Sequence, residues 1–392
     1  MMYQLCVKLP PFSPDYSGVC SALFQLGGLM VIHDASGCTG NYTGYDEPRF
    51  YGSRSLVYCS GLRELDAVMG NDDKFVRRVK QAAEELNPNF ICFLGSPVPM
   101  VIGTDLQGIA KEIEQETKIP SFGFSTTGLH YYNKGIADAW IVFSKRFLLP
   151  KGNLPKIPNG INILGLNPLD FSANDNALEI IQTFNQMGFE VISDFAMHSS
   201  FEQIQNAAAA KANVVVSESG IALAKWFYQE FGIPYVVGAP IGTYCSNKML
   251  ELVNSAMEDG TNKILESGVD QEQNILILHD EVVANSLKTC LVEEYGLTGV
   301  KAASSFVRNS IEYQEKTLSA QSEKEITKLL NEGGFHTIIA DPLMQDLIKS
   351  EEIRLIDFPH VAVSSKIHWD DYVMFCSTKI DQFIKERGII SL

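Results

Sequence analysis

Short runs of apolar residues recur along the chain, and stretches with helical periodicity lie between them. The runs are too short for helices and predict strands at 29–34, 56–59, 90–94, 121–125, 161–166, 190–194, 214–217, 235–238, 274–279, 300–304 and 336–341. Several runs are continuous rather than alternating, which is typical of strands that are covered on both faces. The helical periodicity predicts helices at 72–86, 104–117, 174–187, 222–231 and 243–266.

This alternation of strand and helix predicts an α/β fold with three Rossmann-like units, each a parallel sheet with helices on both faces. The segment 149–160 has three prolines and two glycines and is the best linker, and 268–273 is a second break. The predicted domains are therefore 1–150, 151–270 and 271–392. Ligands of such sheets bind beyond the carboxyl ends of the strands, which directs attention to 35–55, 95–103 and 217–220.

The composition excludes several classes of function. The chain has 392 residues, with 31 Lys and Arg against 47 Asp and Glu, so its formal charge is −16. Such an acidic chain is not expected to bind nucleic acid or an anionic membrane surface. No stretch is long and apolar enough to span a bilayer, and the start does not have a signal-peptide pattern. The eight scattered cysteines suit a reducing compartment, so we expect a cytoplasmic protein.

The common nucleotide and hydrolase motifs are missing from the sequence. It has no G-x-x-x-x-G-K-[ST] motif, and no G-x-G-x-x-G motif follows a predicted strand. H-E-x-x-H and G-x-S-x-G are also absent. No two cysteines lie within four residues of each other, which excludes zinc ribbons and ferredoxin-type clusters. The predicted units therefore bind something other than the usual nucleotides.

The most unusual segment follows the first predicted strand. That strand ends near His33, and Cys38 follows between Gly37 and Gly40. Glycines let the backbone approach a bulky ligand and expose N–H groups that stabilise sulfide or thiolate charge. Cys20 lies near the start of a predicted helix and Cys59 ends the next strand, so three thiolates are candidates for a shared metal cluster.

The alternative for each cysteine is burial as a small apolar side chain. Burial is the better explanation for Cys92, which lies inside an apolar strand, and for Cys245, Cys290 and Cys376. It stays an open alternative for Cys20 and Cys59. Only Cys38, in a glycine-rich loop after a strand, has a position that function explains better than packing.

An ordered series of segments resembles the nitrogenase component 1 family. Residues 16–38 are similar to the cluster-binding start of these proteins, where a helix and a strand precede a His-Gly-x-x-Gly-Cys loop. Residues 58–70 resemble the family segment that ends in Phe-Gly-Gly, and 96–105 resemble its third-cysteine loop. Residues 214–219, 231–235 and 240–242 resemble its second domain. The resemblance implies a 4Fe-4S-type cluster, and Cys38 matches the second cysteine ligand of the family.

The chain departs from the family at other ligand positions. The first family cysteine would fall near 11–13 and the third at Ser96, and neither position is a cysteine. Cys20 and Cys59 replace them if the cluster is held differently, or two cysteines combine with Cys38 of a second subunit. The position of a cofactor-binding cysteine matches Ser217, so dinitrogen reduction on that cofactor is not expected. The resemblance makes His33, Gly37, Ser96 and His368 candidates for cofactor binding.

The resemblance implies the catalytic component of a nitrogenase-like two-component reductase, nearer the minimal tetrapyrrole reductases than true dinitrogenase. A separate ATP-dependent P-loop iron–sulfur reductase would supply electrons, and the chain would form a homodimer or a heterodimer with a similar chain. Asp46 and Glu47 in the loop after Cys38 are candidates for proton donors, with ordinary turn residues as the alternative. Two other functions stay open, namely a scaffold for metal-cofactor assembly and a binding protein for a metal complex or tetrapyrrole.

Overall fold

The computed structural model describes residues 6–53, 56–70, 72–148, 154–268, 274–306, 313 and 316–390. The chain divides into two compact units. We call Ser13–Val142 the N-terminal unit, and Met1–Phe12 together with Phe143–Leu392 the C-terminal unit. The domain boundaries predicted at 150 and 270 lie outside the described residues.

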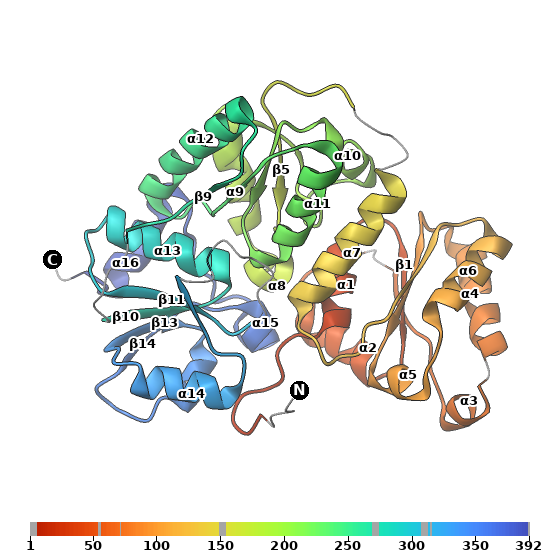
Figure 1. Ribbon diagram of the computed structural model, residues 1–392. Helices are drawn as coiled ribbons and strands as arrows, with labels where there is room; N and C mark the ends of the chain where they lie inside the picture. The colour runs from red at the N-terminus through yellow and green to blue at the C-terminus, as the bar shows by residue number, and fades with distance from the viewer. Residues whose placement is uncertain are drawn as a thin grey trace. The chain divides into compact units, whose positions relative to one another are not determined.

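The N-terminal unit has one parallel sheet in the order β2-β1-β3-β4 (Figure 1). Its strands are β1 (Leu29–His33), β2 (Leu56–Cys59), β3 (Ile91–Gly95) and β4 (Ser121–Phe124). Its helices are α1 (Asp15–Leu23), α2 (Gly37–Asn41), the π-helical turn η1 (Tyr42–Asp46), α3 (Glu64–Met69), α4 (Asp72–Leu86), α5 (Pro97–Ile102) and α6 (Leu106–Thr117), and α7 (Tyr132–Phe147) begins in it. The apolar faces of α4 and α6 pack on β1 and β3 in one buried core.

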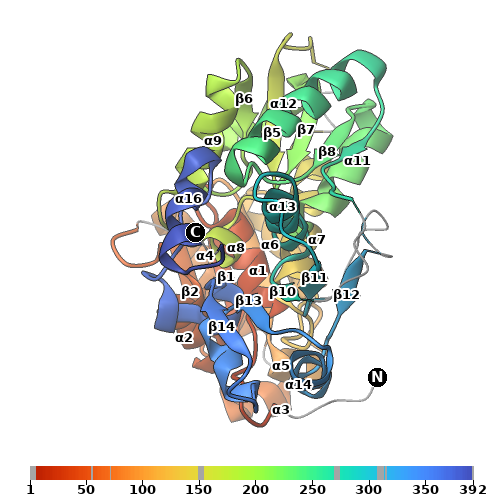
Figure 2. The ribbon, with the colours of Figure 1, turned by 90° about the vertical axis from the view of Figure 1, so that its left-hand side faces the viewer.

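The C-terminal unit has two parallel sheets, as the alternating pattern predicts. The first has the order β6-β5-β7-β8-β9, and the second β12-β11-β10-β13-β14, which Figure 2 shows from β12 at one edge to β14 at the other. The strands of the first are β5 (Gly160–Leu164), β6 (Glu190–Ser193), β7 (Ala212–Val215), β8 (Tyr235–Val237) and β9 (Lys263–Ile264). Those of the second are β10 (Ile275–Leu278), β11 (Val300–Ser304), β12 (Thr317–Ser319), β13 (Thr337–Ala340) and β14 (Arg354–Asp357).

The helices of the C-terminal unit connect and cover these strands. They are α8 (Pro168–Phe171), α9 (Asn176–Gln186), α10 (Phe201–Gln205), η3 (Ala207–Ala209), η4 (Glu218–Gly220), α11 (Ile221–Phe231), α12 (Gly242–Asp259), α13 (Glu281–Glu293), α14 (Glu323–Glu332), η5 (Pro342–Leu347), α15 (Val361–Ser364), η6 (Ser365–His368), η7 (Ser377–Lys379) and α16 (Ile380–Glu386). The helix predicted to reach residue 266 ends at Asp259, because Gly260 adopts a left-handed conformation with φ of 69°. No helix in the described ranges combines the length and the apolar character that crossing a membrane requires.

The carboxyl ends of the two C-terminal sheets face each other. The Glu218 backbone N–H, after β7, donates to Asp280 Oδ2 at 3.0 Å, just after β10. His360 Nε2, after β14, lies 3.0 Å from Asp170 Oδ1, after β5. Parallel sheets place ligand sites at such edges, so this buried polar region is the second place to look for function.

Candidate functional site

Cys38 lies at the carboxyl edge of the N-terminal sheet, in α2, which follows β1. Its side chain is half-buried. The hydroxyl of Tyr16 on α1 hydrogen-bonds to the Cys38 thiol, and the Ser96 hydroxyl is also within hydrogen-bond reach of the thiol. Ser96 Oγ donates to the carbonyl oxygen of His33 at 2.9 Å. The structure therefore brings together three of the predicted residues, Cys38, Ser96 and His33, and adds Tyr16.

Cys59 lies at the same edge of the sheet. It ends β2, which pairs in parallel with β1 so that Cys59 is opposite Ile32. Its Sγ is 3.3 Å from the carbonyl oxygen of Asp34 and accepts the Gly61 N–H at 3.3 Å. Cys59 is close enough to Cys38 for its negative charge to raise the pKa of the Cys38 thiol. Both thiols are half-buried, so this edge presents two of the three predicted metal ligands.

The surroundings of Cys38 favour a neutral thiol when nothing is bound. Burial is the main cause that raises its pKa, and the negative charge of Asp34 adds to it. The hydrogen bonds of Tyr16 and Ser96 lower the pKa but do not cancel the effect of burial. A bound metal ion reverses this balance, because a coordinating thiol loses its proton.

Cys20 lies elsewhere in the N-terminal unit. It is fully buried within α1. Burial raises its pKa well above the ordinary value, and its charged neighbours are Cys92 and Glu47 rather than Cys38. Across the described part of the chain, no three His, Cys, Asp or Glu side chains gather closely enough to hold a metal ion. A single copy therefore does not bring Cys20 together with Cys38 and Cys59.

Asp46 and Glu47 are both buried and hydrogen-bonded within the protein. Asp46 ends the π-helical turn η1 and accepts hydrogen bonds from Ser13 Oγ at 3.1 Å and Ser17 Oγ at 2.7 Å. Glu47 forms a buried ion pair with Arg49 at 2.6 Å. These contacts hold the loop after Cys38 against α1. Their predicted catalytic role stays a prediction.

A cavity of about 230 Å³ lies beside His33 in the N-terminal unit. Residues that follow β1 and β2 line it, together with residues of α3, α4 and the end of α5. His33 Nδ1 hydrogen-bonds to Ser60 Oγ at 2.9 Å, and its ring stacks on Phe75. Burial lowers the pKa of His33, so the ring is neutral at pH 7. A Cβ added to Gly37 would meet no atom within 4 Å, so open space lies beside the Cys38 loop.

The residues of the C-terminal unit do not fit the large metal cofactor that the family implies. Ser217 stands at the position of the cofactor cysteine, and its fully buried hydroxyl donates to the Gly165 carbonyl oxygen at 2.7 Å. His368 Nδ1 lies 2.7 Å from Asp371 Oδ2. The pocket that His368 lines measures only about 30 Å³. Position 217 therefore offers such a cofactor no thiolate, and the pocket at His368 is too small to hold it.

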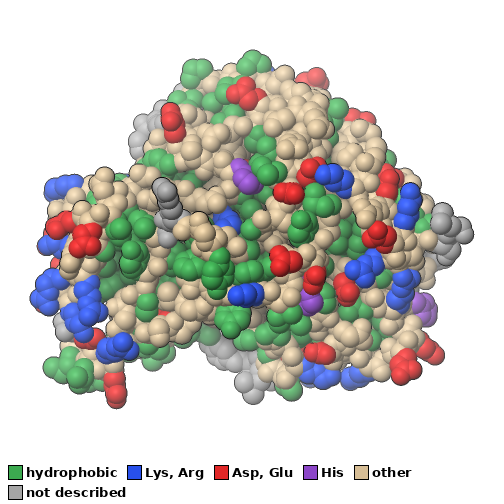
Figure 3. Space-filling model, turned by 180° about the vertical axis from the view of Figure 1, so that it is seen from behind, with side chains coloured by type: hydrophobic (Ala, Val, Ile, Leu, Met, Phe, Trp, Pro, Cys, Tyr) green, Lys and Arg blue, Asp and Glu red, His purple; other side chains and the backbone are tan. Residues whose placement is uncertain are grey.

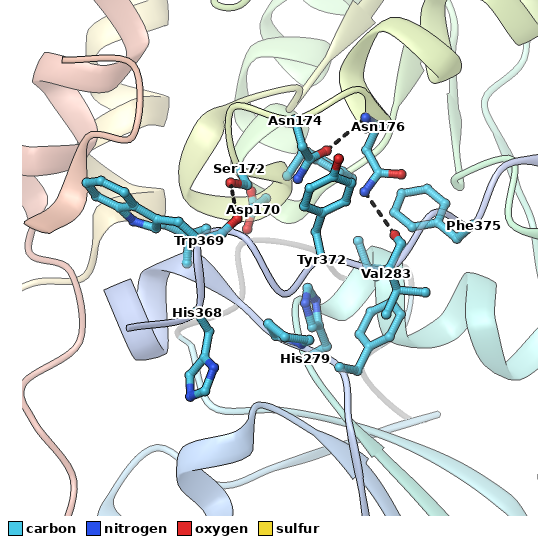
Figure 4. A pocket seen from close by; sticks show the side chains of 15 residues that line it. Asp170, Ser172, Asn174, Asn176, His279, Val283, His368, Trp369, Tyr372 and Phe375 are labelled. Carbon is cyan, nitrogen blue, oxygen red and sulfur yellow. Dashed lines mark hydrogen bonds between the residues drawn. The ribbon is translucent and has the colours of Figure 1, made fainter. Parts of the chain in front are cut away.

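The motifs in the sequence missed a buried polar network in the C-terminal unit. Asp170 bonds to His360, and the His360 ring stacks on that of His279 with centroids 4.1 Å apart. Burial and the neighbouring His360 lower the pKa of His279 well below its ordinary value, and burial and nearby carboxylates raise that of Asp280. The available signal was that His279 and Asp280 directly follow an apolar run. Figure 4 shows part of this network around the pocket.

A sequence profile described as nitrogenase component 1 type oxidoreductase matches residues 14–334. The chain belongs to this family. Among its relatives, it is 29% identical over 236 residues to the nitrogenase iron-molybdenum cofactor biosynthesis protein NifE of Methanosarcina barkeri, a match that covers 56% of this chain and 50% of that protein. It is 25% identical over 215 residues to a subunit of the light-independent protochlorophyllide reductase of Leptolyngbya boryana, which covers 52% and 42%.

The fold agrees with this membership. The solved structure of nitrogenase Cp1 at pH 6.5 superposes with a TM-score of 0.71 and 14% identity, over 99% of this chain and 90% of that one. This likeness concerns the fold alone and confirms the predicted α/β class. The chain spans about half the length of the curated relatives it matches.

Proposed function

We propose that the chain is the catalytic component of a nitrogenase-like two-component reductase, and that two copies hold one 4Fe-4S-type cluster between them. The observation that carries the proposal is the pairing of Cys38 with Cys59 at one sheet edge. A cluster of this type takes four cysteine ligands. Two cysteines from each of two copies supply that number, and Cys20 does not take part.

The residues around Cys38 support a bound cluster. Tyr16 and Ser96 offer hydroxyl groups to the thiol, and hydrogen bonds to cluster sulfur atoms tune its potential. When bound, the cluster would supply single-electron transfer. The empty space beside Gly37, Gly40 and Gly44 leaves room for a cluster or for the backbone of a partner. The substrate stays a proposal as well, and the relatives make a tetrapyrrole one candidate.

An apolar surface near the cavity supports docking of an ATP-dependent iron–sulfur reductase. Leu65, Val68 and Met69 of α3 are each 76% exposed, and Val101 of α5 is 77% exposed. Figure 3 shows apolar side chains projecting at the lower left, where α3 lies. Contiguous exposed apolar side chains mark interaction sites. We call these four residues the α3–α5 surface.

The test is iron and acid-labile sulfide content with a visible spectrum, on anaerobically reconstituted protein beside the variants Cys38→Ala, Cys59→Ala and Cys20→Ala. We expect about four iron atoms per two chains. Iron should be lost in the Cys38 and Cys59 variants and kept in the Cys20 variant. Colourless protein after reconstitution would overturn the proposal, and loss of iron only with Cys20→Ala would overturn the ligand assignment.

The second candidate function is a scaffold on which a metal cofactor is assembled. The similarity to cofactor biosynthesis proteins NifE from two organisms favours it. Turnover with a reductase partner and ATP would support the reductase. Transfer of a bound cofactor to an apo-enzyme without turnover would support the scaffold.

A further inference from the structure

The pocket in the C-terminal unit has the chemistry of a ligand site that the reductase proposal does not use. It measures about 30 Å³, which is room for a molecule the size of one or two waters. Residues that follow β5, β10 and β14 line it, together with the loop that contains His368 and Tyr372. Figure 4 shows that these side chains come from several segments and surround one space.

Two buried acceptor atoms in this pocket have no partner within the protein. His279 is 4% exposed and Asn176 is 3% exposed, yet His279 Nδ1 and Asn176 Oδ1 make no hydrogen bond. The other ring nitrogen of His279 bonds to the Pro359 carbonyl oxygen. Since the ring is neutral, Nδ1 is an acceptor. Buried polar atoms without partners are rare and indicate an occupant, and both of these require a donor.

The walls of the pocket favour a cation over a neutral molecule. Five aromatic residues line it: Phe171, Phe358, Trp369, Tyr372 and Phe375. The Asp170 carboxylate also lines it, and the interior behind holds Glu218, Asp280 and Asp341. Aromatic faces and a carboxylate attract a small cation together, and they do so more strongly away from water.

The unpartnered donors of the pocket lie nearer to solvent. Asn174 Nδ2 and Trp369 Nε1 have no partner, and both side chains are half-buried rather than buried. Water at the mouth of the pocket can accept from them. The buried end of the pocket therefore offers acceptors and negative charge, and the outer end offers donors.

We propose that this pocket binds an ammonium-type cation, either ammonium itself or the end of a primary amine, whose N–H groups donate to His279 Nδ1 and Asn176 Oδ1. A hard metal cation is a poorer match, because it prefers oxygen ligands while one of the two acceptors is an imidazole nitrogen. The proposal concerns the C-terminal unit alone, so it stands or falls independently of the cluster at Cys38.

The experiment uses the full chain labelled with 15N at the tryptophan indoles. The chain has three tryptophans, and Trp369 lines the pocket while Trp140 and Trp226 do not. Ammonium or methylammonium chloride is titrated at constant ionic strength, beside potassium and tetramethylammonium chloride. We expect a saturable shift of the Trp369 indole resonance with the first two salts only, and unchanged Trp140 and Trp226 resonances.

Matched variants test the role of the carboxylate. Asp170→Asn should weaken ammonium binding by roughly ten-fold or more. Asp175→Asn, which changes an exposed carboxylate nearby, should leave binding unchanged. If Asp170→Asn does not fold, as the Trp226 resonance would reveal, His279→Phe replaces it and should also weaken binding. An equal response to potassium, or no saturable shift of Trp369, would overturn the proposal and leave water as the occupant.

Discussion

Arg49 Nε lies 2.6 Å from Glu47 Oε1, and the two side chains are only 7% and 0% exposed. Glu47 also accepts hydrogen bonds from Ser21 Oγ at 2.8 Å and Tyr42 Oη at 3.0 Å. Arg49 donates in turn to the Ser21 carbonyl oxygen at 2.8 Å. The pair therefore ties the segment after Cys38 to α1, next to the proposed cluster edge.

Removing one partner of this pair should destabilise the protein strongly. Arg49→Ala leaves a buried carboxylate without its counter-charge, so the free energy of unfolding should fall by about 3–5 kcal/mol. Urea unfolding followed by circular dichroism measures it. Lys134→Ala is the control, because Lys134 pairs with Asp138 on the surface and its loss should change stability by less than about 1 kcal/mol. Equal effects would contradict the structural role.

The α3–α5 surface should control association without affecting folding. Val68→Asp and Val101→Asp place charges on exposed apolar positions, so stability should change by less than about 0.5 kcal/mol. If the surface docks the reductase, each variant should weaken binding of that partner by roughly ten-fold. Partner binding is measured by sedimentation with the purified reductase, and iron content serves as the control. Unchanged affinity in both variants would exclude the surface.

Two helices of the N-terminal unit approach closely at glycine. A Cβ on Gly18 of α1 would collide with the backbone carbonyl of Tyr132 at the start of α7. Gly18→Ala should therefore destabilise the protein by about 1–3 kcal/mol, because backbone cannot move aside as a side chain does. Gly44→Ala is the matched control, since a Cβ there meets no atom within 4 Å. Thermal unfolding midpoints compare the two, and a larger loss for Gly44→Ala would contradict this account.

The buried His279 should make stability depend on pH. Its pKa in the folded protein is well below the ordinary value of 6.5, so below pH 6.5 the unfolded chain binds a proton that the folded protein does not. The free energy of unfolding should therefore fall as the pH drops from 6.5, by up to about 1.4 kcal/mol per pH unit for this group. Above pH 6.5 the group has no effect.

Urea unfolding at pH 7.5 and 5.5 tests this dependence. His279→Phe should lose less stability between the two pH values than the natural protein, by about 1 kcal/mol or more. His336→Gln, at an exposed histidine, should behave like the natural protein. If His279→Phe keeps the full pH dependence, the titrating group lies elsewhere.

The interior strands were predictable because a strand covered on both faces must be apolar throughout. The run predicted at 56–59 is β2, and the one at 300–304 is β11. The short strands β9, β12 and β14 were missed, and each lies at the edge of its sheet. An edge strand is partly open to water, so it does not need a continuous apolar run. Cys92, predicted to be buried in a strand, is fully buried in β3.

The α/β class, the central strands and the importance of Cys38 could be read from the sequence, because periodicity and local motifs are properties of neighbouring residues. Which cysteines meet depends on the tertiary fold. Parallel pairing of β1 with β2 brings Cys59 to the edge where Cys38 lies, while the burial of α1 turns Cys20 toward Cys92. The Asp170–His360 contact joins residues 190 positions apart, and no local pattern encodes such a distance. Side chains far apart in the chain meet only when the carboxyl ends of separate sheets face each other.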